Sequence, residues 1–204
     1  MPDYQSIMKL HTRIHNRIWK ILFSSNFKRF GKSSSIKFPL KIQNAKYIEI
    51  GNRVHIHHKA WLVALKRDDI IPSFIIDDYT TIGHFATISC LRDIYIGQNV
   101  LIADRVFISD NNHGYEDITL PIQSQPTIFK SSVYIGNNSW IGQNVTIIGA
   151  KIGKHCVIGA NSVATKDIPD YCVAAGSPAI VKKRYNFETN EWQRVDKNGE
   201  FLNA

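Results

Sequence analysis

His113 has the clearest capacity for chemistry in this chain, because it lies where an otherwise regular sequence breaks its pattern. The segment around it is Asn111-Asn112-His113-Gly114-Tyr115. Imidazole titrates near neutrality, so it can remove the proton of an attacking hydroxyl and return a proton to a leaving group. No Ser or Cys has a nucleophile signature such as Gly-x-Ser-x-Gly, which favours direct transfer over a covalent intermediate.

The remaining histidines lie in regular segments: His11 and His15 in an expected helix, His155 at an expected corner, and His55, His57, His58 and His84 in the repeats. The group that orients His113 stays open among Asp110, Glu116, Asp93 and a backbone carbonyl. Asn112 either meets the acceptor molecule or shapes the turn.

A six-residue repeat surrounds this segment and must position it. Each unit has an aliphatic head, usually followed by Gly or a small or acidic residue, as in Ile135-Gly136, Ile141-Gly142 and Ile158-Gly159. A period of six fits neither an amphipathic helix nor an alternating strand, and it predicts an all-β solenoid of stacked coils. Three units form one triangular coil with inward aliphatic heads, and Asn and Gly at its corners tolerate positive φ. The expected coil starts are Ile50, Ile76, Ile96, Ile135 and Ile152.

Two insertions interrupt the repeat. A short one holds Lys66-Arg67-Asp68-Asp69, and a large one, residues 109–131, holds His113. A long loop buries little surface and costs ordering entropy, so we expect the large protruding loop to carry function.

Both ends depart from the repeat and give three predicted segments: residues 1–41, 42–184 and 185–204. The first contains an amphipathic basic helix, Ile7 to Phe23, which either packs on the solenoid or its oligomer or contacts a membrane surface. The last is predicted to be a short extension with a hairpin or meander.

The chain resembles the hexapeptide-repeat acyltransferases, within them the maltose, galactoside and xenobiotic acetyltransferases, and especially the O-acetyltransferases of bacterial surface polysaccharides. The resemblance is densest in Ile135 to Gly142, Ile158 to Val163, Thr165-Lys166-Asp167-Ile168-Pro169 and Val173 to Ala179, and it covers roughly residues 42–184. It implies a left-handed parallel β-helix and a homotrimer with active sites in the clefts between subunits.

The same resemblance implies acetyl-CoA as the acyl donor, a sugar hydroxyl as the acceptor and His113 as the general base. It places Gly142 and Ala160 along the pantetheine arm and Thr165 and Lys166 toward the nucleotide. Trp140 either forms a wall of the acetyl site or packs at a corner. Lys166, Lys182, Lys183 and Arg184 would supply positive charge for the phosphates, with Lys183 among the cofactor residues. Asn112 and Tyr115 are the acceptor-binding candidates.

The composition restricts the partners. The formal charge is +8, but no nucleic-acid motif accompanies it, so an anionic cofactor or polymer is expected instead. Cys90, Cys156 and Cys172 lack metal-ligand spacing and are interpreted as buried thiols of a cytoplasmic protein, with no metal site. No apolar run is long enough to span a membrane.

Other functions stay open at this stage. An antibiotic or xenobiotic O-acetyltransferase would differ only in the loops around the acceptor. A γ-carbonic-anhydrase-like enzyme would need three histidines converging on zinc across a subunit interface. A non-catalytic trimeric scaffold is the third alternative.

Overall fold

In a computed structural model of the protein, residues 3–67, 69–196 and 199–202 are described. Residues 1–2 and 203–204, at the ends of the predicted terminal segments, and Asp68, in the short insertion, lie outside this range.

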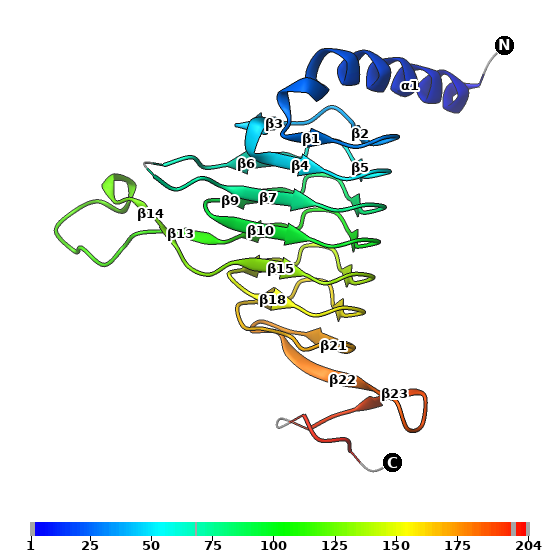
Figure 1. Cartoon of the computed structure of the whole chain (residues 1–204). Helices are drawn as coiled ribbons and strands as arrows, with labels where there is room; N and C mark the ends of the chain where they lie inside the picture. The colour runs from blue at the N-terminus through cyan, green and yellow to red at the C-terminus, as the bar shows by residue number, and fades with distance from the viewer. Residues whose placement is uncertain (1–2, 68, 197–198, 203–204) are drawn as a thin grey trace.

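The chain winds into a solenoid of stacked parallel strands that form three long sheets (Figure 1). The first sheet contains β1 (Arg29–Phe30), β4 (Ile48–Ile50), β7 (Ser73–Ile76), β10 (Asp93–Ile96), β15 (Val133–Ile135) and β18 (Lys151–Ile152). The second contains β2 (Ser35–Ile36), β5 (His55–Ile56), β8 (Thr81–Ile82), β11 (Leu101–Ile102), β16 (Trp140–Ile141), β19 (Val157–Ile158) and β21 (Cys172–Ala175). The third contains β3 (Lys41–Gln43), β6 (Trp61–Ala64), β9 (Thr87–Cys90), β12 (Phe107–Ser109), β17 (Thr146–Ile148) and β20 (Val163–Ala164).

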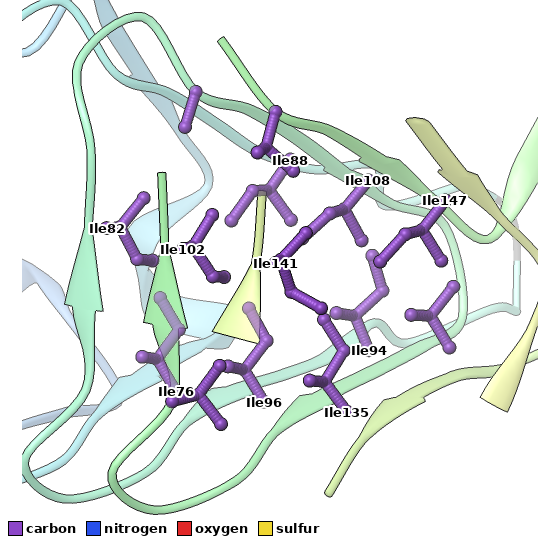
Figure 2. Close-up of a cluster of buried hydrophobic side chains, with 14 of the residues drawn as sticks. Ile76, Ile82, Ile88, Ile94, Ile96, Ile102, Ile108, Ile135, Ile141 and Ile147 are labelled. Carbon is purple, nitrogen blue, oxygen red and sulfur yellow. The ribbon is translucent and has the colours of Figure 1, made fainter. Parts of the chain in front are cut away.

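The aliphatic heads of the repeat point inward and stack in columns (Figure 2). In the first sheet Ile50, Ile76, Ile96, Ile135 and Ile152 are in register from strand to strand. Their exposed fraction is 0%, so each removes nearly its whole side chain from water. The predicted coil starts and the inward orientation of the heads are therefore confirmed.

Three sets of corners join the sheets. The first corner follows the first sheet, the second corner follows the second sheet, and the third corner follows the third sheet and returns to the first. Asn99, Asn138, Asn144 and Asn161 have positive φ at the first and second corners, as predicted for Asn.

Gly149, at the third corner, also has a positive φ of 55°, as predicted for Gly, whereas the glycines that directly follow the aliphatic heads, such as Gly142, do not. Gly142 shows why glycine is needed: a Cβ there would lie 2.7 Å from the backbone nitrogen of Ala160 in the next coil. The close approach of stacked coils, rather than the turn itself, therefore selects glycine at the second position of the repeat.

The N-terminal helix is present as α1 (Tyr4–Phe23), which lies across the N-terminal end of the solenoid (Figure 1). It begins three residues before the predicted Ile7, because the Asp3 side chain caps it by accepting from the Ser6 N–H at 2.7 Å. Three 3₁₀ turns, η1 (Ser24–Asn26), η2 (Ala45–Tyr47) and η3 (Ile122–Ser124), lie outside the strands. Among the described residues, no helix has the length and apolar character to cross a membrane.

Parallel pairing begins at β1, so coil structure is present before residue 42, in the segment that the sequence assigned to the lead-in. At the other end β21 pairs antiparallel with β22 (Ile180–Asn186), and β22 pairs with β23 (Glu191–Arg194). The C-terminal hairpin therefore starts at residue 180, inside the range that the sequence assigned to the solenoid.

Candidate functional site

His113 lies on a hairpin that leaves the solenoid at the third corner. After β12 the chain enters β13 (Asn111–His113), which pairs antiparallel with β14 (Thr127–Phe129), and His113 lies opposite Thr127. The hairpin and its tip extend sideways from the stack of coils (Figure 1). The His113 side chain is exposed, so it can meet a molecule or a surface outside its own solenoid.

Asp110 anchors the base of the hairpin. Its carboxylate is fully buried and accepts hydrogen bonds from the backbone N–H groups of Leu91 (2.7 Å), Arg92 (2.7 Å) and Asp93 (2.8 Å) in the preceding coil. It also accepts from the Asn111 amide at 2.7 Å. These four donors, and the Cys90 thiol at 3.9 Å, occupy the carboxylate, so Asp110 positions the hairpin and does not orient the His113 ring.

The tip of the hairpin has its own internal support. The Gln125 side chain is buried, and its amide donates to the carbonyl oxygens of Asp117 (2.9 Å) and Leu120 (3.2 Å). Gly114 donates its N–H to the Pro126 carbonyl at 2.8 Å, and a Cβ on Gly114 would meet that oxygen at 2.9 Å. These hydrogen bonds tie the segment after His113 to the residues that lead into β14.

The two acceptor-binding candidates flank His113 differently. Side chains alternate along a strand, so Asn112 lies on the opposite face of the hairpin from His113. Tyr115 is 65% exposed just beyond the strand. Within residues 3–67, 69–196 and 199–202, no group hydrogen-bonds the His113 ring, and Glu116 and Asp93 do not do so in this single chain.

A groove of about 590 Å³ lies beside the last coil and β22, a size within the usual range for small-molecule sites. Its lining includes Lys166, Lys182 and Arg184, three of the four cations proposed from the sequence. Lys183 lies between Lys182 and Arg184 on β22. Its side chain therefore points to the other face of the strand and does not line the groove. Thr165 is half-buried next to Lys166 at the third corner.

The other cofactor candidates lie at or beside the second corner. Ala160 is exposed there and lies against Gly142 from the next coil. Gly142 itself is buried, and its N–H already donates to the Ile158 carbonyl at 2.8 Å. Its amide is therefore not available as a donor to a ligand. Trp140 is half exposed on the outer face of β16, immediately before this corner.

The candidate residues therefore fall into two groups on each chain. His113, Thr165 and Lys166 belong to the third corner, whereas Gly142 and Ala160 belong to the second corner, and the third sheet runs between the two corners. One chain alone does not bring the expected base next to the expected pantetheine residues.

A histidine cluster at the second corner was not anticipated. The rings of His57 and His58 lie 4.9 and 5.4 Å from the ring of His84, and His84 Nδ1 lies 3.1 Å from a carboxylate oxygen of Asp104. Burial, followed by nearby positive charge, lowers the pKa of His57 to about 4. The signal was available in the repeat, because all four residues follow in-register isoleucines of the second sheet.

The cysteines are buried thiols, as predicted. Burial raises the pKa of Cys156 to about 11, and it also raises the pKa values of Cys90 and Cys172. A thiol with a raised pKa is a poor nucleophile near neutrality. No group of three or more His, Cys, Asp or Glu side chains suited to a metal ion occurs in the described part of the chain.

Comparison with known proteins identifies the repeat. Residues 132–166 match a family model described as the hexapeptide repeat of succinyl-transferase. Over 167 residues the chain is 36% identical to the putative lipopolysaccharide biosynthesis O-acetyl transferase WbbJ of Escherichia coli K12, covering 78% of this chain and 83% of that protein.

Two solved structures share the architecture. A maltose O-acetyltransferase from Clostridium difficile 630 is 26% identical, with a TM-score of 0.54 and coverage of 86% of this chain and 87% of that one. AntD, an N-acyltransferase from Bacillus cereus solved with dTDP and 3-hydroxybutyryl-CoA, has a TM-score of 0.66 at 20% identity, covering 83% and 89% of the two chains. At that identity AntD supports the fold alone.

Proposed function

Since the chain belongs to the hexapeptide-repeat acetyltransferases and is an acyltransferase, we propose that it moves an acetyl group from acetyl-CoA to a sugar hydroxyl during assembly of bacterial surface polysaccharide. The sugar would belong to a lipopolysaccharide O-antigen, a capsule or an exopolysaccharide. The observation that carries this substrate class is the 36% identity to WbbJ over 83% of its length. Use of acetyl-CoA puts the reaction in the cytoplasm.

His113 is the proposed general base. Its ring nitrogen takes the proton of the sugar hydroxyl as the oxygen attacks the thioester carbonyl carbon. A tetrahedral oxyanion forms, and a fixed N–H donor stabilises it. The carbon–sulfur bond then breaks, and the imidazolium returns the proton so that coenzyme A leaves as a thiol. The buried, raised-pKa cysteines support direct transfer without an acyl-enzyme.

The proposed assembly is a homotrimer of left-handed β-helices with the site between subunits. The split of the candidate residues between the second and third corners supports this arrangement. A hairpin that extends from one solenoid can carry His113 to the second corner of a neighbour, where Ala160 and Trp140 are exposed.

Acetyl-CoA would lie along that cleft. The groove beside β22 offers Lys166, Lys182 and Arg184 to the phosphates, and cations are the side chains that phosphates require. Asn112 and Tyr115 are the acceptor-side candidates, from opposite sides of the hairpin.

The test is thiol release from acetyl-CoA by the purified protein with a panel of nucleotide sugars and polysaccharide fragments. We expect acceptor-dependent release that His113→Ala reduces at least a hundredfold, in line with the loss of a general base. The matched control is His155→Ala, an exposed histidine at the first corner. Equal rates for wild type and His113→Ala would refute the assigned base.

The same assay, with antibiotics added to the panel, separates the alternatives. Release that depends on an antibiotic and on no saccharide would identify a xenobiotic acetyltransferase. Absence of release with every acceptor would favour a scaffold, or a metalloenzyme if the purified protein held zinc.

A further inference from the structure

Helix α1 presents an uncovered apolar stripe that the catalytic proposal does not use. Its members recur at helical spacing along the whole element, and each is 51–72% exposed: Ile7, Leu10, Ile14, Ile18, Ile21 and Leu22. A helix of this length is about 30 Å long. Scattered apolar residues are normal on a surface, but a contiguous stripe of this length indicates an interaction site.

The opposite side of α1 is the side that holds the helix on the solenoid. His15 stacks on Phe38 with ring centroids 3.6 Å apart, and Trp19 lies 6.1 Å from Phe27 and 6.0 Å from Phe30. Trp19 also packs against the main core. These contacts fix the rotation of the helix, and the exposure of the stripe residues shows that the stripe faces away from the coils.

The charged residues of α1 indicate which kind of surface covers the apolar stripe. Tyr4 to Phe23 contains no acidic residue, and exposed Arg13 and Arg17 flank the stripe on one side. Lys20 is turned toward the solenoid, 3.5 Å from the Gly31 carbonyl oxygen. A second copy of α1 laid on the stripe would bring arginines together without a carboxylate on either helix to pair them. An anionic lipid surface instead accepts the apolar side chains and attracts the arginines.

We propose that α1 attaches the protein to anionic membrane surfaces, with its apolar stripe in the headgroup–acyl boundary and Arg13 and Arg17 at the phosphates. The helix lies in the plane of the surface, and the solenoid stands on it by its N-terminal end. This proposal does not depend on the acetyltransferase assignment.

The experiment is sedimentation of the full-length protein with lipid vesicles. We expect binding to mixed phosphatidylglycerol–phosphatidylcholine vesicles at least about tenfold stronger than to phosphatidylcholine alone, and weakened by salt. The double variant Ile14→Gln/Ile18→Gln should lower the partition coefficient about tenfold or more, because it removes two apolar anchors. Ile118→Gln, a 95% exposed isoleucine in the hairpin loop, is the matched control and should bind as wild type does.

Light scattering of the same proteins without lipid tests the alternative that a second copy of the chain covers the stripe. Unchanged oligomeric mass of the double variant, together with lost vesicle binding, supports the lipid surface. The proposal is wrong if the wild type remains in the supernatant with anionic vesicles. It is also wrong if the double variant changes its mass and still binds vesicles, and the stripe is then a protein contact. Circular dichroism of each full-length variant checks that the helical signal of the wild type is retained.

Discussion

Asp110→Asn tests whether a buried carboxylate holds the proposed catalytic hairpin in place. In the wild type the two carboxylate oxygens accept from the backbone N–H groups of Leu91, Arg92 and Asp93 at 2.7–2.8 Å. An asparagine keeps one acceptor oxygen. Its amide nitrogen cannot accept from the N–H groups of Arg92 and Asp93, both of which donate to the same oxygen, so two hydrogen bonds are lost.

The magnitude follows from those two bonds. A hydrogen bond to a charged group contributes about 1.5–3 kcal/mol. We take the lower value, because asparagine avoids the cost of burying a charge, and obtain about 3 kcal/mol for the two. A tenfold change in an equilibrium constant corresponds to about 1.4 kcal/mol. A loss of about 3 kcal/mol should therefore lower the protection of these amides against hydrogen exchange on the order of a hundredfold.

The assay is native-state hydrogen exchange on the peptide that spans residues 91–93, with turnover measured on the same samples. We expect faster exchange, and a fall in kcat without a comparable change in KM for acetyl-CoA, because displaced His113 loses its alignment. His113→Ala should lower kcat and leave exchange unchanged. Asp117→Asn, at an exposed carboxylate that accepts from the Thr119 N–H at 2.9 Å, is the control and should leave both unchanged. Wild-type exchange and turnover in Asp110→Asn would refute the positioning role.

Three further predictions follow from individual contacts. Gly142→Ala should destabilise the protein by about 1–3 kcal/mol in urea denaturation, because its Cβ would lie 2.7 Å from the Ala160 nitrogen, whereas Ala160→Ser should be tolerated. Lys182→Glu should raise KM for acetyl-CoA about tenfold, and Lys183→Glu on the opposite face of β22 should have a smaller effect; the reverse order would disprove the role of the groove. Burial lowers the pKa of His57 from 6.5 to about 4. Between pH 6.5 and 4 the unfolded chain therefore binds a proton at this residue that the folded chain does not bind, and the folded state loses stability as the pH falls. The melting temperature should therefore fall as the pH drops from 6.5 to 4, and His57→Gln should reduce that slope; an identical slope would assign it to other groups.

The solenoid was predictable from the sequence because its determinants are local. The six-residue period predicts which side chains point inward, and this prediction does not depend on residues elsewhere in the chain. The in-register column from Ile50 to Ile152 and the position of the large insertion follow directly from that period. The first coil was missed although Phe30, Ile36 and Ile42 keep the six-residue spacing and pair in register with the next coil, because its first head is Phe rather than an aliphatic residue.

The candidate site was only partly predictable. His113 could be singled out because it lies in the break of the repeat. The role of Asp110 could not be, since its partners lie 17–19 residues earlier in the coil before it. The charge of Lys183 and its place in the sequence predict a cofactor residue, but side chains alternate along β22. Lys182 and Arg184 therefore line the groove, and Lys183 does not.

The sequence by itself determined the repeat, the inward-facing core, the insertion that carries His113 and the amphipathic character of the N-terminal helix. Only the tertiary structure decided which side of α1 is covered, which cations share a groove and which histidines meet at the second corner. The physical reason is that the core depends on a pattern along the chain, whereas these features depend on stacking between coils. Residues that pair between the parallel strands of adjacent coils lie 16 to 39 positions apart, depending on the insertions between them.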